Sequence, residues 1–207
     1  MARAESRGLF VTLEGVDGAG KSPHVAGVAE RLRAAGREVL VTREPGGTPL
    51  AERLREQILD EALDPIPETL LMFAARADHV ARVIRPGLAR GACVVCDRFT
   101  DASYAYQGGG KGVAAEFITR LAELTHPGLA PDLTLLFDCP YEVSQSRLAG
   151  AGRSLDRFER ESQAFFERVR TVYLDLAARN PGRFRVIDGS RPLQDIKNQL
   201  DELIASL

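Results

Sequence analysis

The chain has 207 residues, with 27 Lys and Arg against 29 Asp and Glu, so its formal net charge is −2. This balance argues against a protein that binds nucleic acid or anionic membranes over a broad surface. It leaves room for a local basic cluster around a small phosphate ligand. The length favours one compact domain over residues 1–207, with elaborations rather than a second domain.

No segment predicts a membrane span, because the longest stretch without an ionic side chain, 102–110, has nine residues against the roughly 20 required. The N-terminus lacks the apolar run of a secretory signal, so we expect a cytoplasmic protein. The cysteines, Cys93, Cys96 and Cys139, lie in or beside apolar runs and are interpreted as buried thiols of a reducing compartment. Cys93 and Cys96 should face opposite sides of one strand, which argues against a metal pair.

Short apolar runs alternate with helical patterns along the whole chain. Strands are predicted over 9–13, 38–42, 92–96, 133–137 and 184–187. Helices are predicted over 21–35, 49–59, a long stretch from 67 or 68 to 90, 113–124, two segments between 138 and 184, and 193–207. Gly36 should end the first helix, and the long helix should bend or break near Pro86 and Gly87.

Strands separated by helices of ten or more residues favour right-handed crossovers. The sequence therefore predicts an α/β fold in which a five-stranded parallel sheet is flanked by helices on both faces. The segment 147–158 interrupts the pattern with charged residues and weak apolar periodicity. With Gly150 and Gly152 as hinges, it is interpreted as a mobile lid.

The sharpest motif, G-x-x-x-x-G-K-[ST], runs from Gly15 to Ser22 between a predicted strand and a predicted helix. Its glycines let successive backbone N–H groups curl round a phosphate, and the helix N-terminus adds partial positive charge. Lys21 supplies a cation for the β- and γ-phosphates, and Ser22 supplies a hydroxyl for Mg²⁺. The predicted ATP site comprises Gly15, Val16, Asp17, Gly18, Ala19, Gly20, Lys21 and Ser22.

The residue after this motif, Pro23, has neither an N–H nor a hydroxyl, so it cannot donate to a phosphate. Proline is tolerated in the first turn of a helix, so the fold need not suffer. The expected cost is one donor at the nucleotide, on the order of 1 kcal/mol or somewhat more for a charged acceptor.

Four further segments follow at predicted strand ends or in loops: REPGGT from Arg43, DRF from Asp97, AYQGGG from Ala105 and LDRFE from Leu155. Ligands of open parallel sheets bind beyond the carboxyl ends of the strands, so these groups should converge near Lys21. The ordered set resembles the bacterial thymidylate kinases, a family of P-loop nucleoside monophosphate kinases, over nearly the whole chain from 9 to about 193. The resemblance implies transfer of the γ-phosphoryl of ATP to dTMP, with Mg²⁺, in dTTP biosynthesis.

The resemblance also implies roles for individual residues. Catalytic roles fall to Lys21, Asp97, Arg98 and the lid arginines Arg153 and Arg157. Ser22 and Asp97 would hold Mg²⁺, the latter through water. The implied dTMP site comprises Asp17, Arg43, Glu44, Pro45, Phe73, Arg76, Arg98, Ser103, Tyr106 and Gln107, with Arg76 reading the thymine edge and Tyr106 beneath the deoxyribose.

The chain departs from the family pattern near Arg76. Members commonly carry an aromatic residue four positions earlier, which here is Met72, whereas Phe73 is three positions earlier. Both positions share a helical face with Arg76, and we predict that Phe73 packs on the base. Because Ala19 is not basic, the lid is expected to supply the second cation, as in the family's subtype whose catalytic arginine lies there.

Two other functions stay open: another nucleoside monophosphate kinase, or a nucleotide-binding regulatory protein whose catalysis Pro23 weakens. The expected partners are ATP and dTMP, without nucleic acid or membrane. The resemblance implies a homodimer, with the long helix from Glu68 as its seam. His24, His79 and His126 share no spacing with one another or with a cysteine, so they are interpreted as surface or capping groups.

Overall fold

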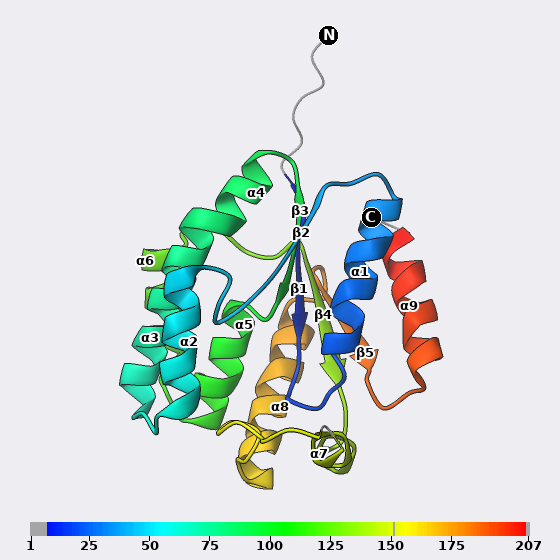
Figure 1. Ribbon diagram of the computed structural model, residues 1–207. Helices are drawn as coiled ribbons and strands as arrows, with labels where there is room; N and C mark the ends of the chain where they lie inside the picture. Colours follow the sequence, from blue (N-terminus) through cyan, green and yellow to red (C-terminus); the bar gives the residue numbers. More distant parts are fainter. Residues whose placement is uncertain (1–7, 151, 206–207) are drawn as a thin grey trace.

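The structure is a computed structural model that describes residues 8–150 and 152–205; predictions for 1–7, 151, 206 and 207 lie outside the described residues. Its strands form one parallel sheet in the order β2-β3-β1-β4-β5 (Figure 1). The strands are β1 (Phe10–Glu14), β2 (Val39–Arg43), β3 (Cys93–Asp97), β4 (Leu133–Asp138) and β5 (Phe184–Asp188). The predicted α/β fold with a five-stranded parallel sheet is confirmed.

Each strand extends one residue beyond the predicted end and finishes on a charged side chain. These residues are Glu14, Arg43, Asp97, Asp138 and Asp188. The apolar pattern stops at the charge, whereas the backbone ladder continues, because a parallel partner still supplies hydrogen bonds. The β3 end pairs with Leu13 on one side and Arg43 on the other. Charged groups are thereby gathered at the carboxyl edge of the sheet.

Helices cover both faces of the sheet. Helices α1 and α9 lie together on one face, and η1, α4 and α8 lie on the other (Figure 1). The bounds are α1 (Ser22–Ala34), α2 (Pro49–Asp60), α3 (Pro65–His79), η1 (Val80–Ile84), α4 (Arg85–Ala89), α5 (Thr100–Ser103), η2 (Tyr104–Gly110), α6 (Ala115–Thr125), α7 (Tyr141–Ala149), α8 (Gln163–Arg179) and α9 (Leu193–Ala205). None of these described helices is long and apolar enough to cross a membrane.

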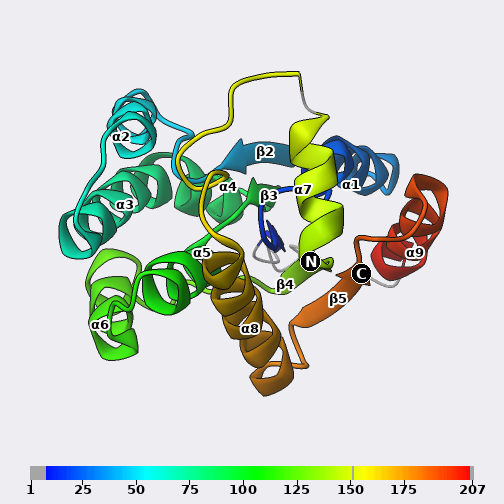
Figure 2. The same cartoon turned by 90° about the horizontal axis from the view of Figure 1, so that it is seen from below.

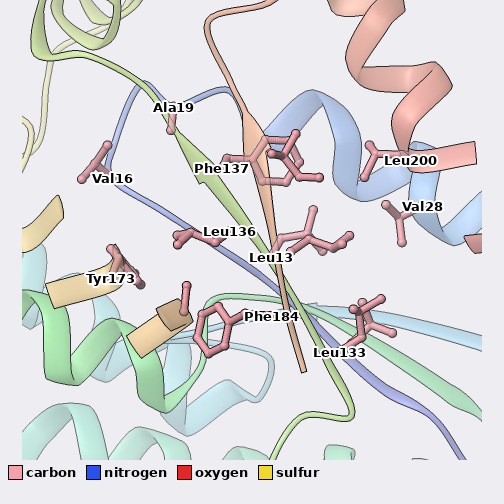
Figure 3. Packing of buried hydrophobic residues seen from close by; sticks show 14 of the residues in the cluster. Leu13, Val16, Ala19, Val28, Leu133, Leu136, Phe137, Tyr173, Phe184 and Leu200 are labelled. Atoms are coloured by element: carbon pink, nitrogen blue, oxygen red, sulfur yellow. The ribbon is translucent and has the colours of Figure 1, made fainter. Parts of the chain in front are cut away.

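The largest core cluster joins the sheet to α1, α8 and α9. Val28 of α1 and Leu200 of α9 approach Leu13 and Phe137 from one side, while Tyr173 of α8 lies on the other (Figure 3). A second cluster packs Phe10 and Cys96 against η1 and α4. Cys93 belongs to the first cluster and Cys96 to the second, so the prediction that they face opposite sides is confirmed.

The long predicted helix does not break at Pro86. It runs from α3 through the π-helical turn η1 into α4, and its irregular turn ends just before the proline. A proline lacks the N–H that an α-helix needs and crowds the carbonyl four residues earlier, so wider π geometry ahead of it accommodates the ring. Gly36 ends α1 with a φ of 82°, as predicted.

The segment 100–110, which carries no apolar periodicity, is helical in the structure as α5 and η2. It packs along α8, and a Cβ at Gly110 would lie 2.4 Å from the Phe165 ring, so glycine is required for this close approach. The helix sends Tyr104 and Tyr106 in different directions. Tyr104 contacts Thr119 on α6, whereas Tyr106 lies inside the molecule beside the phosphate loop.

Candidate active site

The phosphate loop connects β1 to α1 at the carboxyl edge of the sheet, as predicted (Figure 1). Gly18 has a φ of 73°, and a Cβ there would lie 2.6 Å from the carbonyl oxygen of Ser144. The Ser144 hydroxyl donates to the Asp17 carbonyl at 2.8 Å, and the Arg147 guanidinium donates to the Gly18 carbonyl at 3.3 Å. Helix α7 therefore braces the loop from outside.

The Lys21 ammonium lies within the curve of this loop. Its Nζ donates to the carbonyls of Gly15 at 2.8 Å and Val16 at 2.9 Å. Burial lowers the pKa of Lys21 to about 8, and Arg98 acts in the same direction while Asp17 opposes it. A lysine held this way is ready to exchange carbonyl partners for phosphate oxygens.

An open cavity of about 1220 Å³ lies in front of the loop. Its lining includes Lys21, Ser22 and Pro23 from the loop and the start of α1. The positive side chains around it are Lys21, Arg43, Arg55, Arg98, Arg147 and Arg153. The same lining contains the acidic side chains Asp17, Glu44, Asp97, Asp156 and Glu159, so most of the cations can be held by protein carboxylates until a phosphate ligand binds.

Arg98 follows β3 with a φ of 69°, in the left-handed region that non-glycine residues seldom occupy. Its guanidinium donates to Gly15 O at 2.6 Å, Asp17 Oδ1 at 2.5 Å and the Tyr106 hydroxyl at 3.1 Å. The Tyr106 hydroxyl donates in turn to Asp17 Oδ2 at 2.7 Å. Burial opposes ionisation of Asp17, yet Arg98 and Lys21 lower its pKa. Asp17, Arg98 and Tyr106, each assigned to the dTMP site from the sequence, thus form one hydrogen-bonded unit.

A second cavity, of about 560 Å³, adjoins the first and is hereafter called the acceptor cavity. It is lined by Asp17, Glu44, Pro45, Arg55, Leu59, Met72, Arg76, Arg98, Phe99, Ala102, Ser103, Tyr106, Gln107, Asp156 and Phe158. The two cavities share Asp17, Glu44, Arg55, Arg98 and Asp156. Two ligands could therefore meet at Arg98, one held at each side.

Arg76 lies in the wall of the acceptor cavity and is almost fully buried. Its Nε donates to Glu44 Oε2 at 2.6 Å, and its two terminal nitrogens donate to Ser103 Oγ at 3.1 Å and Phe99 O at 3.2 Å. His79 holds Glu44 from the other side, with Nδ1 at 2.9 Å from Oε1. This network orders the guanidinium before any ligand arrives.

Phe73 does not lie where the sequence predicts. It is 1% exposed and lies behind Arg76, whose guanidinium carbon is 4.6 Å from the ring centroid. Met72, one residue earlier, lines the acceptor cavity instead. On a helix adjacent residues point about 100° apart, so when Phe73 turns into the α3–α6 core, Met72 turns toward the cavity.

The two lid arginines named as catalytic occupy different places. Arg153 lines the phosphate-loop cavity and pairs with Glu159 at 2.5 Å. Arg157 points away from that cavity and donates to Glu68 on α3 and to the Ile58 carbonyl at the end of α2. The prediction that Arg157 faces the transferred phosphoryl is not supported by this geometry. Arg147 belongs to α7 and donates to Gly189 O at 2.7 Å.

The residues predicted to hold Mg²⁺ lie in the same cavity. Asp97 Oδ1 is buried without a hydrogen-bond partner, and Ser22 is exposed at the start of α1. An unpartnered carboxylate oxygen and a hydroxyl are hard oxygen donors of the kind Mg²⁺ takes. Within the described residues no group of three or more His, Cys, Asp or Glu is arranged to hold a metal ion.

Several residues at the site escape the sequence patterns. Arg55 reaches both cavities from α2, and Glu14 lies beneath the loop, accepting from Phe99 N at 2.7 Å and from the Tyr173 hydroxyl at 2.8 Å. Burial and the nearby Asp101 raise the pKa of Glu14 to about 8. The only sequence signal for Glu14 is an acidic residue closing an apolar strand directly before a phosphate loop.

The interpretation of the three histidines as surface or capping groups holds only for His126, which is the C-cap residue of α6 and donates its backbone N–H to Ala122 O. His24, His79 and His126 are all buried. His24 stacks on Phe137, and His79 bonds Thr42 at 2.6 Å in addition to Glu44. Burial lowers the pKa of His126 to about 4, so it packs as a neutral ring against Phe73 and Phe99.

A phosphate loop after the central strand, facing a second cavity that adjoins the first at Arg98, places the protein among the P-loop nucleoside monophosphate kinases. Comparison narrows this class, because the family model described as thymidylate kinase matches residues 13–200. The chain belongs to the thymidylate kinase family.

Individual relatives agree with this assignment. The thymidylate kinase of Bordetella pertussis is 57% identical over 201 residues, covering 97% of this chain and 96% of the relative. That of Cupriavidus metallidurans is also 57% identical and is covered over 100% of its length. A crystal structure of thymidylate kinase from Ehrlichia chaffeensis matches with a TM-score of 0.77 and 31% identity, over 96% of this chain and 99% of that chain.

Proposed function

We propose that this protein transfers the γ-phosphoryl group of ATP to dTMP, giving dTDP, in the biosynthesis of dTTP. The observation that carries the proposal is the pair of adjoining cavities that share Asp17, Arg55 and Arg98. Phosphoryl transfer requires two anionic substrates held end to end with the charge of the moving group neutralised. The family favours dTMP as the acceptor over both alternatives that the sequence leaves open.

In this mechanism the phosphate loop binds ATP. The backbone N–H groups of 15–22 and the Lys21 ammonium hold the β- and γ-phosphates. Arg98 lies at the junction of the cavities, where it contacts the acceptor phosphate and balances the developing charge. Arg153 extends from the lid into the phosphate-loop cavity. We therefore assign its guanidinium as the lid cation that neutralises charge on the transferred phosphoryl group.

Mg²⁺ would be held by Ser22 and, directly or through water, by Asp97, and it would neutralise charge on the ATP phosphates. Asp97 is fixed for this task by its place as the last residue of β3. Its buried Oδ1 accepts nothing from the protein, so it is free to accept from a cation or its water.

In the acceptor cavity the donors of Arg76, Ser103 and Gln107 surround the space for the base, with Met72 on the apolar side. Glu44 and Pro45 line the acceptor cavity just after β2. Arg43, the last residue of β2 and predicted from the sequence to bind dTMP, lines the phosphate-loop cavity instead. Arg43 pairs with Glu52 at 2.8 Å. Glu44 accepts a hydrogen bond from Arg76, so its role is to orient the Arg76 guanidinium. Tyr106 presents its ring beneath the sugar, as the resemblance implies.

We further propose that the segment 147–158 is the lid and that the protein acts in the cytoplasm as a homodimer. The lid crosses from α7 to α8 over the carboxyl edge of the sheet (Figure 2). On α3, Ile66 and Leu70 lie one turn apart and are 45% and 46% exposed, which supports a partner on that helix. Leu70→Glu should yield a monomer by analytical ultracentrifugation, and Glu116→Lys serves as a surface control.

The function is tested by measuring ADP release with ATP, Mg²⁺ and one of dTMP, dUMP, dCMP, AMP or GMP. We expect the highest kcat/KM with dTMP, because the chain belongs to the thymidylate kinase family. A Lys21→Met protein prepared in parallel controls for contaminating kinases. A stronger preference for any other monophosphate, or ATP binding without turnover on any of them, contradicts the proposal.

A further inference from the structure

Glu68 of α3 has no role in the mechanism above, yet it is the meeting point of three segments. It is fully buried. Its Oε1 accepts from Gln107 Nε2 at 2.9 Å, and its Oε2 accepts from Lys111 Nζ at 2.6 Å and from a terminal nitrogen of Arg157. These donors come from η2, from the residue that follows it, and from the lid. A buried carboxylate needs such partners, so Glu68 ties the three segments together.

The donors held by Glu68 surround one lid side chain, Phe158. The guanidinium carbon of Arg157 lies 4.5 Å from the Phe158 ring centroid, and Lys111 Nζ lies 5.0 Å from it. The Tyr106 ring meets the same ring edge-on at 5.8 Å. Phe158 and Gln107 both line the acceptor cavity. The lid therefore forms part of the wall around the acceptor, held there through Glu68.

The same lid segment also borders the phosphate-loop cavity, where we place ATP. Arg153 and Asp156 of the lid, with Glu159 just beyond it, line the phosphate-loop cavity. Asp156 and Phe158 line the acceptor cavity, and Arg157 lies between them in sequence and bonds Glu68. When the lid leaves the site, Arg157 leaves Glu68, and the buried carboxylate keeps only Lys111 as a cationic partner. Loss of one partner from a buried pair is costly, so Glu68 favours the closed lid.

We propose that Glu68 is a positioning residue that orients Gln107 in the acceptor cavity and, through Arg157, sets Phe158 against bound dTMP. Acceptor binding and lid closure then favour each other, because the wall that dTMP contacts exists only in the closed arrangement. The inference rests on the assignment of this cavity to dTMP. It gives Arg157 an acceptor-side role in place of contact with the transferred phosphoryl.

A double-mutant cycle tests the pairing. Arg157→Met and Glu68→Gln should each raise the KM for dTMP about tenfold, with kcat at saturating dTMP changed far less. The double variant should match Glu68→Gln alone, because one interaction is lost in both. Arg157→Lys should recover part of the affinity. Arg160→Met is the matched control, since this exposed arginine lies just beyond the lid, donates to the Leu155 carbonyl and should leave both constants unchanged.

Other results overturn the inference. A fall in kcat with an unchanged KM in Arg157→Met would assign this arginine to the phosphoryl group. Additive effects in the double variant would show that Glu68 and Arg157 act separately. If Glu68→Gln does not fold, Lys111→Met removes a cation from the same carboxylate and should also raise the KM for dTMP.

Tryptic cleavage measures whether dTMP protects the lid, and a purely structural role of Glu68 would not change that protection. Arg153 and Arg157 in the lid, and Arg160 just beyond it, remain as cleavage sites in Glu68→Gln. In the wild type, dTMP without ATP should slow cleavage about fivefold, and in Glu68→Gln it should give no protection. Equal protection of both proteins, or of neither, overturns the coupling.

Arg76→Ala separates this inference from the site assignment. If that variant leaves the KM for dTMP unchanged, the cavity is not the acceptor site. If it raises the KM whereas the Glu68 variants do not, only the positioning role of Glu68 is wrong.

Discussion

The phosphate loop and the acceptor cavity are built in different ways. The loop is one run of eight residues, 15–22, whose donors are mostly backbone N–H groups and whose shape comes from local dihedral angles. The acceptor cavity gathers side chains from positions as distant as Glu44 and Phe158, oriented by ion pairs and hydrogen bonds. A site of the first kind depends on its own residues, whereas the second depends also on residues that never contact the ligand, such as His79 and Glu68.

The largest expected effect lies in the loop. Lys21→Met should lower kcat about 10³-fold, because one preorganised cation at the transferred phosphate is lost. The fold should persist, since methionine fills a similar volume and removes a buried charge. Steady-state kinetics with a urea unfolding curve measure both quantities. A loss below tenfold would show that the arginines around the cavity replace Lys21.

The next effect concerns the wall of the acceptor cavity. Phe73→Ala should lower the free energy of unfolding by about 3–5 kcal/mol, because it empties a buried ring site beside Val113 and Ile118. Met72→Ala should cost less stability and raise the KM for dTMP about tenfold, since Met72 lines the cavity. Denaturant unfolding and kinetics on both proteins decide the assignment. The reverse pattern would restore Phe73 as the base-packing residue.

At alkaline pH, loss of the Lys21 charge should lower kcat/KM for ATP. Only the protonated ammonium attracts phosphate, and burial lowers the pKa of Lys21 to about 8, so affinity is present below that pH and lost as pH rises through it. We expect kcat/KM for ATP to fall about tenfold for each pH unit above 8, because this parameter reports ionisations of the free enzyme. A profile that stays flat to pH 9.5 contradicts the assignment, and Lys21→Met should lack this limb.

The smallest effect is a gain. Pro23→Thr restores an N–H and a hydroxyl at an exposed residue on the edge of the phosphate-loop cavity. One added hydrogen bond to a charged acceptor is worth about 1 kcal/mol or somewhat more, so kcat/KM for ATP should rise about fivefold. Pro23→Ala restores only the N–H and separates the two donors. If neither variant differs from wild type in kcat/KM for ATP, the donors missing at Pro23 do not limit activity.

The same contrast explains how far the sequence could predict the site. Gly15, Lys21 and Ser22 are fixed by spacing within one motif, and Asp97 and Arg98 follow from the rule that parallel strands end at one edge. Local order therefore gives both the fold class and the phosphate loop.

Predictions failed where a contact depends on distant elements. Whether Met72 or Phe73 faces the cavity depends on how α3 is rotated against α6, which periodicity does not determine. Arg157 could not be placed without knowing that Glu68, 89 residues earlier, lies within reach. His79 is buried because Glu44 and Thr42 satisfy its ring, and a single histidine in a sequence carries no sign of such partners.

The left-handed backbone of Arg98 is a local conformational cost that the folded chain carries at its active site. Such a conformation costs a non-glycine residue of order 1–3 kcal/mol, and the cost is present in the empty enzyme. Binding therefore need not supply it, because the guanidinium already stands at the junction of the two cavities. Glycine at this position would relax the backbone, but it would also remove the guanidinium that bonds Gly15, Asp17 and Tyr106. The folded chain therefore carries a local backbone cost together with the side chain that both completes this buried network and stands where two ligands would meet.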